Sequence, residues 1–374
     1  MNRSVLFVGA FPRPAALERY VSGDLAARLE SHGWQVRVAS RAVSRAGRLW
    51  DILWHTWRAR NEYEIACVDL YSGPAFLWAQ AACAVLKRLR KRFVLTLHGG
   101  SLPQFARRHP RRVERLLCAA AAVTCPSPYL LAQMRHVRAD LILLPNGLDL
   151  AKYSFRERRP PFRHLVWLRA FHAIYNPGLA VEVVAKLKPG GDLRLTMIGP
   201  DKKDGSLAST KAAAARLGVA GAVSFRGAVA KQDVPNELAE GDIFMNTTNF
   251  DNTPVSVLEA MACGLPVVTT NVGGIPYLLE DGQTALLTPP GDAKTMADAV
   301  RRLGHEPELA SKLGRNARAK VELFSWEGIL PKWEELLESL AAGQRIAAQG
   351  GKRDTAQKSL LTGPGTEDAS WERC

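Results

Sequence analysis

The sequence predicts an α/β protein with two doubly wound domains, each built on a parallel β-sheet that helices cover on both faces. Short apolar, β-branched runs alternate with amphipathic segments from residue 4 to residue 144. The same alternation resumes at residue 165, after a polar stretch broken by prolines. Because a helix separates each strand from the next, we expect the strands to pair in parallel.

The first predicted domain covers residues 1–155 and opens with a βαβ unit. We predict strands at 4–9, 35–39, 63–71, 93–97, 122–125 and 141–144, and helices at 16–31, 75–89 and within 103–120. Turns are predicted at 11–14 and 145–147. Residues 156–163 are polar and broken by prolines, which predicts a linker.

The second predicted domain covers residues 164–324. We predict strands at 165–168, 193–198, 223–225, 243–246, 267–270 and 285–287, and helices at 179–187, 210–217, 235–239, 257–262 and 294–303. A last helix within 325–341 is expected to cross back to the first domain, and Pro331 favours a start or a kink at that position. Residues 342–374 lack periodicity, which predicts a disordered tail.

The composition is ordinary, but the charge is unevenly distributed. Hydrophobic residues make up 47% and charged residues 23% of the chain, which excludes disordered, collagen-like and disulfide-scaffold proteins. The net charge is +14, and residues 1–160 hold 26 Lys and Arg against 11 Asp and Glu, so the excess lies entirely in this part. Such a charge allows a nucleic acid, an anionic membrane or an acidic substrate as partner.

The cysteines and the apolar runs indicate where the protein resides. The six cysteines form no CxxC pair and no Cys/His cluster with zinc spacing, which predicts reduced thiols and no metal site. The apolar run 5–11 is too short for a signal peptide, and no stretch reaches the roughly 20 apolar residues of a spanning helix. We therefore expect a cytoplasmic protein.

The most informative segment is Asp251-Asn252-Thr253-Pro254-Val255-Ser256-Val257-Leu258-Glu259-Ala260-Met261-Ala262-Cys263-Gly264-Leu265-Pro266-Val267-Val268, followed by Asn271-Val272-Gly273-Gly274. A polar loop leaves a strand, and a short helix begins near Ser256. The open N–H groups of a helix N-terminus suit a phosphate or a sugar hydroxyl. Asp251 lies just before the helix and Glu259 one turn inside it, so both carboxylates can face the same ligand. In the alternative interpretation, Asp251 or Ser256 caps the helix and Glu259 is solvated.

This segment resembles the donor-site signature of the family-4 retaining glycosyltransferases (glycosyl transferases group 1), which have the two-domain GT-B fold. In that pattern, an acidic residue precedes a Glu by seven intervening positions, and Ala-Met-Ala-x-Gly-x-Pro-Val-Val follows. Asp251 and Glu259 match, with Asp where Glu is usual, and the similarity extends to about residue 340. The resemblance implies that Glu259 holds the nucleotide ribose and Asp251 the sugar hydroxyls. It also implies that the backbone holds the sugar and diphosphate through Thr253, Pro254, Val255 and Ser256.

Trp167-Leu168-Arg169 resembles a second family element, a Gly-Arg at a strand end followed by a Lys. A guanidinium there stabilises the charge that grows on the leaving diphosphate without a metal. The expected Lys is absent from residues 170–177. Lys202 or Lys203 could reach the same phosphates, and Tyr175 or Asn176 could donate a hydrogen bond. Alternatively, Lys202 is a solvated loop lysine.

Leu95-Thr96-Leu97-His98-Gly99-Gly100 resembles the family's His-Gly element, which implies that His98 orients the reacting sugar rather than acting as a base. In the alternative, His98 is structural. Residues 145–149 resemble the hinge-proximal turn of the family. The usual glycine pair of the first βα loop is absent from residues 11–19, where Arg13 and Arg19 could contact an anionic acceptor.

Three basic clusters carry the N-terminal charge. The first flanks a helical stripe of Trp50, Trp54 and Trp57, a pattern typical of helices that lie in a membrane interface. The others contain Lys87, Arg88, Arg90, Lys91 and Arg92, and Arg107, Arg108, Arg111, Arg112 and Arg115. Alternatively, the Trp stripe packs on the sheet, the second cluster complements a helix dipole and the third is solvated.

The sequence therefore predicts a retaining, metal-independent hexosyltransferase. Its expected donor is a UDP or GDP sugar, with no other cofactor, and its expected acceptor is a lipid-linked or otherwise anionic cell-surface glycan precursor. We expect peripheral contact with the inner, anionic face of a membrane and no nucleic-acid partner, because no recognition module accompanies the basic clusters. The alternatives are a degenerate nucleotide-sugar-binding protein and another GT-B activity, such as an epimerase or a phosphorylase.

Overall fold

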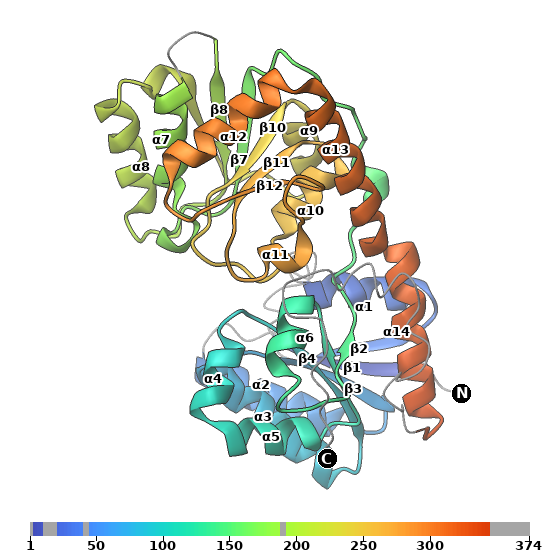
Figure 1. Ribbon diagram of the computed structural model, residues 1–374. Helices are drawn as coiled ribbons and strands as arrows, with labels where there is room; N and C mark the ends of the chain where they lie inside the picture. Colours follow the sequence, from blue (N-terminus) through green and yellow to red (C-terminus); the bar gives the residue numbers. More distant parts are fainter. Residues whose placement is uncertain (1–2, 10–20, 40–44, 188–191, 345–374) are drawn as a thin grey trace. The chain divides into compact units, whose positions relative to one another are not determined.

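The computed structural model describes residues 3–9, 21–39, 45–187 and 192–344 (Figure 1). Among these residues, the chain forms two compact units. The first comprises residues up to Gly147 together with those from Trp326 onward, and the second comprises Leu148–Ser325. Each unit contains one six-stranded sheet whose strands all pair in parallel. The predicted fold class is confirmed.

The sheet of the first unit has the strand order β2-β1-β3-β4-β5-β6. Its strands are β1 (Ser4–Val8), β2 (Gln35–Ala39), β3 (Ile65–Leu70), β4 (Arg92–Leu97), β5 (Ala122–Cys125) and β6 (Ile142–Leu143). Its helices are α1 (Val21–Ser31), α2 (Arg45–Arg58), α3 (Pro74–Arg88), α4 (Leu102–Arg108), α5 (Pro110–Cys118), α6 (Pro128–Met134) and α14 (Trp326–Ala341). Helices α1 and α14 share one core with the sheet, and α2, α3 and α5 lie on its other face (Figure 1).

The sheet of the second unit has the order β12-β11-β10-β7-β8-β9. Its strands are β7 (His164–Leu168), β8 (Arg194–Ile198), β9 (Val223–Gly227), β10 (Ile243–Asn246), β11 (Val267–Thr270) and β12 (Leu286–Thr288). Its helices are α7 (Pro177–Leu187), α8 (Ser206–Arg216), α9 (Val234–Ala239), α10 (Val255–Ala262), α11 (Ile275–Leu278), α12 (Ala293–His305) and α13 (Pro307–Val321). The direction of strand addition reverses between β7 and β10, which is the place where ligands bind in open α/β sheets.

Three helical details differ from the prediction, and prolines explain them. The single helix expected within 103–120 is two helices, because Pro110 starts α5 directly after α4 ends. Helices α6, α11 and α13 were not predicted. Helices α6 and α13 each begin with a proline at the first position, and α11 has Pro276 at its second, where the missing N–H does no harm. Helix α14 runs from Trp326 through Pro331, so it does not start at that proline.

The segment around the predicted linker packs with the second unit. The buried guanidinium of Arg158 donates hydrogen bonds to the carbonyl oxygens of Ala239, Gly241 and Cys263, at 3.0, 2.9 and 2.8 Å. Residues 148–163 therefore belong to the second unit, and the first unit ends at Gly147. The predicted tail beyond residue 344 lies outside the described residues.

Helix α14 packs in the first unit. The Trp34 indole donates a hydrogen bond to Glu334, and Arg3 forms an ion pair with Glu338. The ring of Trp326 lies against Gly147, where a Cβ atom would approach it to 2.3 Å. The turn that precedes the unit boundary therefore requires glycine.

Candidate functional site

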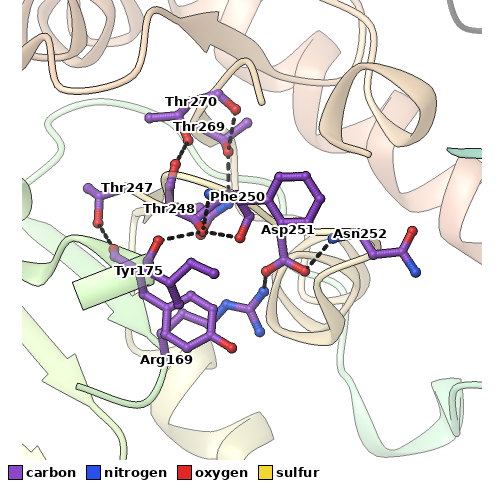
Figure 2. A network of polar contacts seen from close by, with 11 residues as sticks. Arg169, Tyr175, Thr247, Thr248, Phe250, Asp251, Asn252, Thr269 and Thr270 are labelled. Atoms are coloured by element: carbon purple, nitrogen blue, oxygen red, sulfur yellow. Dashed lines mark hydrogen bonds and ion pairs between the residues drawn. The ribbon is translucent and has the colours of Figure 1, made fainter. Parts of the chain in front are cut away.

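Arg169 and Asp251 meet at the place in the second sheet where the direction of strand addition reverses. Arg169 follows β7 and Asp251 follows the neighbouring strand β10. Nη2 of Arg169 forms an ion pair with Oδ2 of Asp251 (Figure 2). The two side chains are only 16% and 14% exposed. Two residues that lie 82 positions apart in the sequence thus form one charge-compensated pair at the expected ligand edge of the sheet.

The guanidinium of Arg169 is held in place by an aromatic ring. Its central carbon lies 4.7 Å from the centroid of the Tyr175 ring. Thr247 anchors Tyr175 by donating a hydrogen bond to its carbonyl oxygen at 2.9 Å, and the Trp167 indole donates to Thr247 at 2.8 Å. Burial lowers the pKa of Arg169, which still carries a proton at neutral pH. Nε of Arg169 is buried and has no hydrogen-bond partner among the described residues, so an acceptor on a ligand would satisfy it.

Buried hydroxyl groups at the ends of β10 and β11 fix the loop that carries Asp251. The Thr248 hydroxyl lies 2.9 Å from the carbonyl oxygen of Phe250, to which it donates, and Thr270 donates to the carbonyl oxygen of Thr248 (Figure 2). Asn246 donates to Thr269 at 2.9 Å. This network leaves the Asp251 side chain little freedom to move away from Arg169.

Two glycines hold the same loop from the other side. The N–H of Gly274 donates to the carbonyl oxygen of Asp251 at 2.8 Å. A Cβ atom on Gly274 would lie 1.7 Å from the carbonyl oxygen of Asn252, and one on Gly273 would lie 2.2 Å from that of Asp251. The Gly-Gly pair at the end of the sequence motif is therefore needed for close backbone packing.

The N-terminus of α10 has no side-chain cap. Pro254 occupies the N-cap position, and Oδ1 of Asp251 accepts instead from the N–H of Asn252 at 2.8 Å. The Ser256 hydroxyl is buried without a hydrogen-bond partner among the described residues. The interpretation that Asp251 or Ser256 caps the helix is therefore wrong. The N–H of Val257 donates to the carbonyl oxygen of Pro254, so within the described residues the N–H groups of Val255 and Ser256 are left for an anion.

Glu259 is buried rather than solvated, with 6% of its surface exposed. The Tyr153 hydroxyl donates to Oε1 of Glu259 at 2.9 Å. Burial raises the pKa of Glu259, whereas the Tyr153 hydrogen bond and the positive charges of Lys231 and Arg169 lower it. Burial also raises the pKa of Tyr153, which keeps its phenol protonated as a donor.

The loop that carries Lys202 runs beside the Arg169 segment. The N–H of Phe171 donates to the carbonyl oxygen of Pro200 at 2.9 Å, and the N–H of Lys202 donates to that of Phe171 at 3.1 Å. A Cβ atom on Gly199 would lie 1.8 Å from the carbonyl oxygen of Arg169. The Lys202 side chain is exposed and has no ion-pair partner within the described ranges.

His98 lies in the first unit, directly after β4, and is part of a polar cluster. Its Nε2 lies 2.9 Å from Oδ1 of Asp69, and the Ser22 hydroxyl donates to the same oxygen at 2.7 Å. The ring stacks on Tyr71 at 4.9 Å and lines a cavity of about 20 Å³. Because a carboxylate only accepts, Nε2 is the donor in this contact, and Nδ1 is the ring nitrogen that remains for a ligand.

The structure adds partners that the sequence analysis missed. Asp69 has a signal in the sequence, since it is an acidic residue near the end of an apolar strand. Tyr153 and Lys231 have none, because each lies in a loop remote in sequence from Glu259.

The Trp stripe of α2 is exposed. Trp50, Trp54 and Trp57 are 72%, 49% and 46% exposed, while Ile52 and Thr56 form the buried face of the helix. The interpretation that the stripe packs on the sheet is therefore wrong. The basic side chains of the third cluster extend from α4 and α5. Four of them are exposed without a carboxylate partner among the described residues, namely Arg107, Arg108, Arg111 and Arg115. Arg13 and Arg19 lie outside those residues.

Two family models match most of the chain. One, described as Glycosyltransferase Family 4, matches residues 17–152, and the other, described as Glycosyl transferases group 1, matches residues 163–306. The chain belongs to the family-4 glycosyltransferases. Like other members of this family, the chain has the GT-B fold.

Solved structures and relatives agree with this membership. The structure of sucrose-phosphate synthase from Thermosynechococcus elongatus matches with a TM-score of 0.76 and 18% identity. The match covers 91% of this chain and all of the synthase chain. Anabaena HepE, solved with UDP and glucose, covers 90% and is also covered completely, with a TM-score of 0.73 and 20% identity. A D-inositol 3-phosphate glycosyltransferase of Paenarthrobacter aurescens is 27% identical over 67% of this chain, which spans 65% of that relative's length.

Among the described residues, no group of three or more His, Cys, Asp or Glu side chains could hold a metal ion. No helix in the same part of the chain is long and apolar enough to cross a bilayer.

Proposed function

We propose that this chain is a retaining glycosyltransferase that moves a hexose from a nucleoside diphosphate sugar to an anionic or lipid-linked glycan precursor, without a metal. One observation carries the proposal. At the switch point of the second sheet, a buried arginine lies beside the uncapped N-terminus of α10, with Asp251 before this helix and Glu259 one turn inside it. This is an arrangement suited to a diphosphate with a sugar on each side.

Each group has a role that follows from its surroundings. The diphosphate accepts hydrogen bonds from the N–H groups of Val255 and Ser256 and from Nε of Arg169, which has no partner among the described residues. As the glycosidic bond breaks, Arg169 stabilises the charge on the leaving diphosphate. Lys202, on the adjacent loop, adds a second cation in place of the family's missing lysine. Asp251 binds the sugar hydroxyls and Glu259 the ribose.

In the first unit, His98 binds a substrate hydroxyl through Nδ1. Asp69 acts as a positioning residue, because its carboxylate fixes the proton on Nε2 and leaves Nδ1 as the acceptor. Ser22 holds that carboxylate in turn.

Other observations support the choice of donor and acceptor. A structural neighbour was solved with UDP and glucose, which supports a UDP sugar as donor. A relative's name includes inositol 3-phosphate, a phosphate-bearing molecule, and the basic charge of the first unit suits an acceptor of that kind. The exposed Trp stripe supports peripheral contact with an anionic membrane, and hence a reaction at its cytoplasmic face.

The release of UDP from UDP-glucose tests the site. We expect Arg169→Ala to slow turnover about a hundredfold, the usual effect of removing a group that stabilises transition-state charge. Asp251→Ala should also slow turnover, because the sugar hydroxyls lose their proposed partner. Glu259→Ala should mainly raise KM. Asp298→Ala and Arg301→Ala remove an exposed ion pair on α12 and serve as matched controls with unchanged turnover.

Wild-type turnover in all three site variants would show that the assignment is wrong. Donor binding without any turnover in the unmodified protein would instead favour a non-catalytic nucleotide-sugar-binding protein. The absence of a lysine between residues 170 and 177 makes this the specific alternative.

A further inference from the structure

Residues of α3 and α5 line a groove on the first unit. The two helices lie on the face of the sheet away from α14 (Figure 1). Two of the basic clusters, which are separate in the sequence, meet in the groove. Lys87 belongs to the second of the three clusters, and Arg112 and Arg115 belong to the third. The remaining lining residues are Gln80, Cys83, Ala84, Leu116 and Ala119. The groove thus combines three cations with a floor that is mostly apolar.

The arginine at the centre of the groove is held rigidly. Arg112 donates through both Nε and Nη2 to Oε1 of Gln80, at 3.0 and 2.5 Å, and its guanidinium lies 5.2 Å from the Phe76 ring centroid. The charge of Lys87 lowers the pKa of the Cys83 thiol, while burial of that thiol raises its pKa to about 12. The ammonium group of Lys87 is therefore close enough to the groove floor to affect the Cys83 thiol.

The three cations have no anionic partner among the residues that the structure describes. None of Lys87, Arg112 and Arg115 forms an ion pair with a carboxylate in the described part of the chain. Glu114, the one acidic residue of α5, does not line the groove. A cationic rim above an apolar floor complements an amphiphile that carries a phosphate. The lining contains no aromatic ring on which a nucleic-acid base could stack.

The groove lies in the helical layer that carries the exposed Trp stripe. Helix α2 packs beside α3, and Arg48 of α2 lies 5.2 Å from the ring centroid of Trp78 on α3. Leu77, which is 51% exposed, shares one face of α3 with Gln80, Ala84 and Lys87 by its helical spacing. Apolar contact and cation binding are therefore available on the same layer.

We propose that the groove between α3 and α5 binds the head group and glycerol of one anionic phospholipid at a membrane surface. The phosphate contacts Lys87, Arg112 and Arg115, and the glycerol and the first methylene groups lie on Ala84, Leu116 and Ala119. The proposal rests on the membrane contact proposed above, and it adds a defined lipid site to that contact. A diffuse positive surface, by contrast, would bind according to net charge alone.

Vesicle flotation of the full chain tests the site, with phosphatidylcholine vesicles compared with vesicles that contain phosphatidylglycerol as well. The variant Lys87→Ala/Arg115→Ala removes two cations from the groove. Arg107→Ala/Arg108→Ala removes the same charge from α4, outside the groove, and is the matched control. Ala84→Gln fills the groove without changing the charge. Release of UDP from UDP-glucose is measured on each variant, so failure of the proposed transferase function is recorded separately.

We expect the groove double variant to bind the phosphatidylglycerol vesicles about thirtyfold more weakly, and Ala84→Gln about tenfold more weakly. The control pair should lose less than fivefold, and binding to pure phosphatidylcholine should be weak throughout. Equal losses in the two double variants, or wild-type binding by Ala84→Gln, would overturn the proposal in favour of a diffuse charge effect. Wild-type affinity of the groove double variant would also overturn it.

Discussion

At the scale of single residues, the buried carboxyl group of Glu259 acts against stability. Its carboxyl group is buried, and burial raises its pKa in the folded protein. The unfolded chain therefore releases this proton at a lower pH than the folded protein does. As a result, the contribution of Glu259 to the free energy of unfolding becomes less favourable as the pH rises above about 4.5.

Glu259→Gln should separate binding from stability. The glutamine carbonyl can still accept the Tyr153 hydrogen bond, but it carries no charge that has to be desolvated. We expect the variant to gain stability relative to wild type between pH 4 and pH 7, and to bind donor at least tenfold more weakly. Urea unfolding at both pH values, together with donor titration, measures the two effects. A wild type that gains stability over the variant with rising pH would contradict the account.

Much of the arrangement of the proposed donor site could be predicted from the sequence, because its residues follow strands or lie in one contiguous segment. Asp251 and Glu259 share a motif, and Arg169 ends a strand, so topology alone brings them to one sheet edge. The partner of Glu259 could not be predicted in this way, because Tyr153 lies 106 residues from it and only tertiary packing brings the pair together. In the first unit, Asp69 has a sequence signal near a strand end, but its contact with His98 is known only from the structure.

At the scale of elements, α2 has an exposed apolar face and a buried one. The ring centroids of Trp54 and Trp57 lie 5.8 Å apart, and the central guanidinium carbon of Arg60 lies 4.5 Å from the Trp57 ring centroid. Aromatic rings beside guanidinium groups suit the head-group region of a bilayer. The sequence spacing predicted this stripe correctly, whereas its exposure became evident only from the structure.

Replacement of Trp50, Trp54 and Trp57 by alanine tests this helix as a membrane contact. We expect the triple variant to co-sediment with anionic vesicles at least tenfold less than wild type at low salt, since the apolar area available for insertion is lost. Because the three rings are exposed, thermal stability should change little. Unchanged co-sedimentation, or no binding by the wild type, would rule out docking through α2.

In the segment 156–163, hydrogen bonds of a buried arginine, rather than apolar packing, attach the chain to the second unit. Arg158 is 3% exposed, and its guanidinium donates to four backbone carbonyl oxygens. They belong to Ala239 at the end of α9, to Gly241, to Cys263 directly after α10, and to Arg156. Burial lowers its pKa to about 10, so it remains charged at neutral pH. The sequence pattern indicates only a polar stretch here, because such carbonyl acceptors leave no trace in side-chain composition.

Arg158→Met should destabilise the second unit by about 3 kcal/mol, because several buried carbonyl oxygens lose their donors. Arg159→Met is the matched control: its side chain is 73% exposed, and we expect a change within about 0.5 kcal/mol. Urea unfolding followed by circular dichroism measures both. Equal stability of the two variants would show that Arg158 does not fasten this segment.

At the scale of the whole molecule, the two parts of the chain carry very different net charge, although each builds a similar sheet. Residues 1–160 hold all of the positive excess, whereas the rest of the chain, including the proposed donor site, is nearly neutral. The alternation of strands and helices predicted both sheets, because parallel sheets with buried faces give continuous apolar strands. Strand order and the two helices that begin at Pro128 and Pro307 required the structure.

Donor binding measured by thermal unfolding tests the central claim most directly. A ligand that binds the folded state stabilises it by about 2.7 kcal/mol at a concentration a hundred times its Kd. We predict that UDP-glucose or another UDP or GDP sugar raises the unfolding temperature of the wild type, and that the rise is largely lost in Glu259→Gln. An unfolding temperature that no nucleotide sugar changes, or an equal rise in wild type and variant, would contradict the assignment of the site.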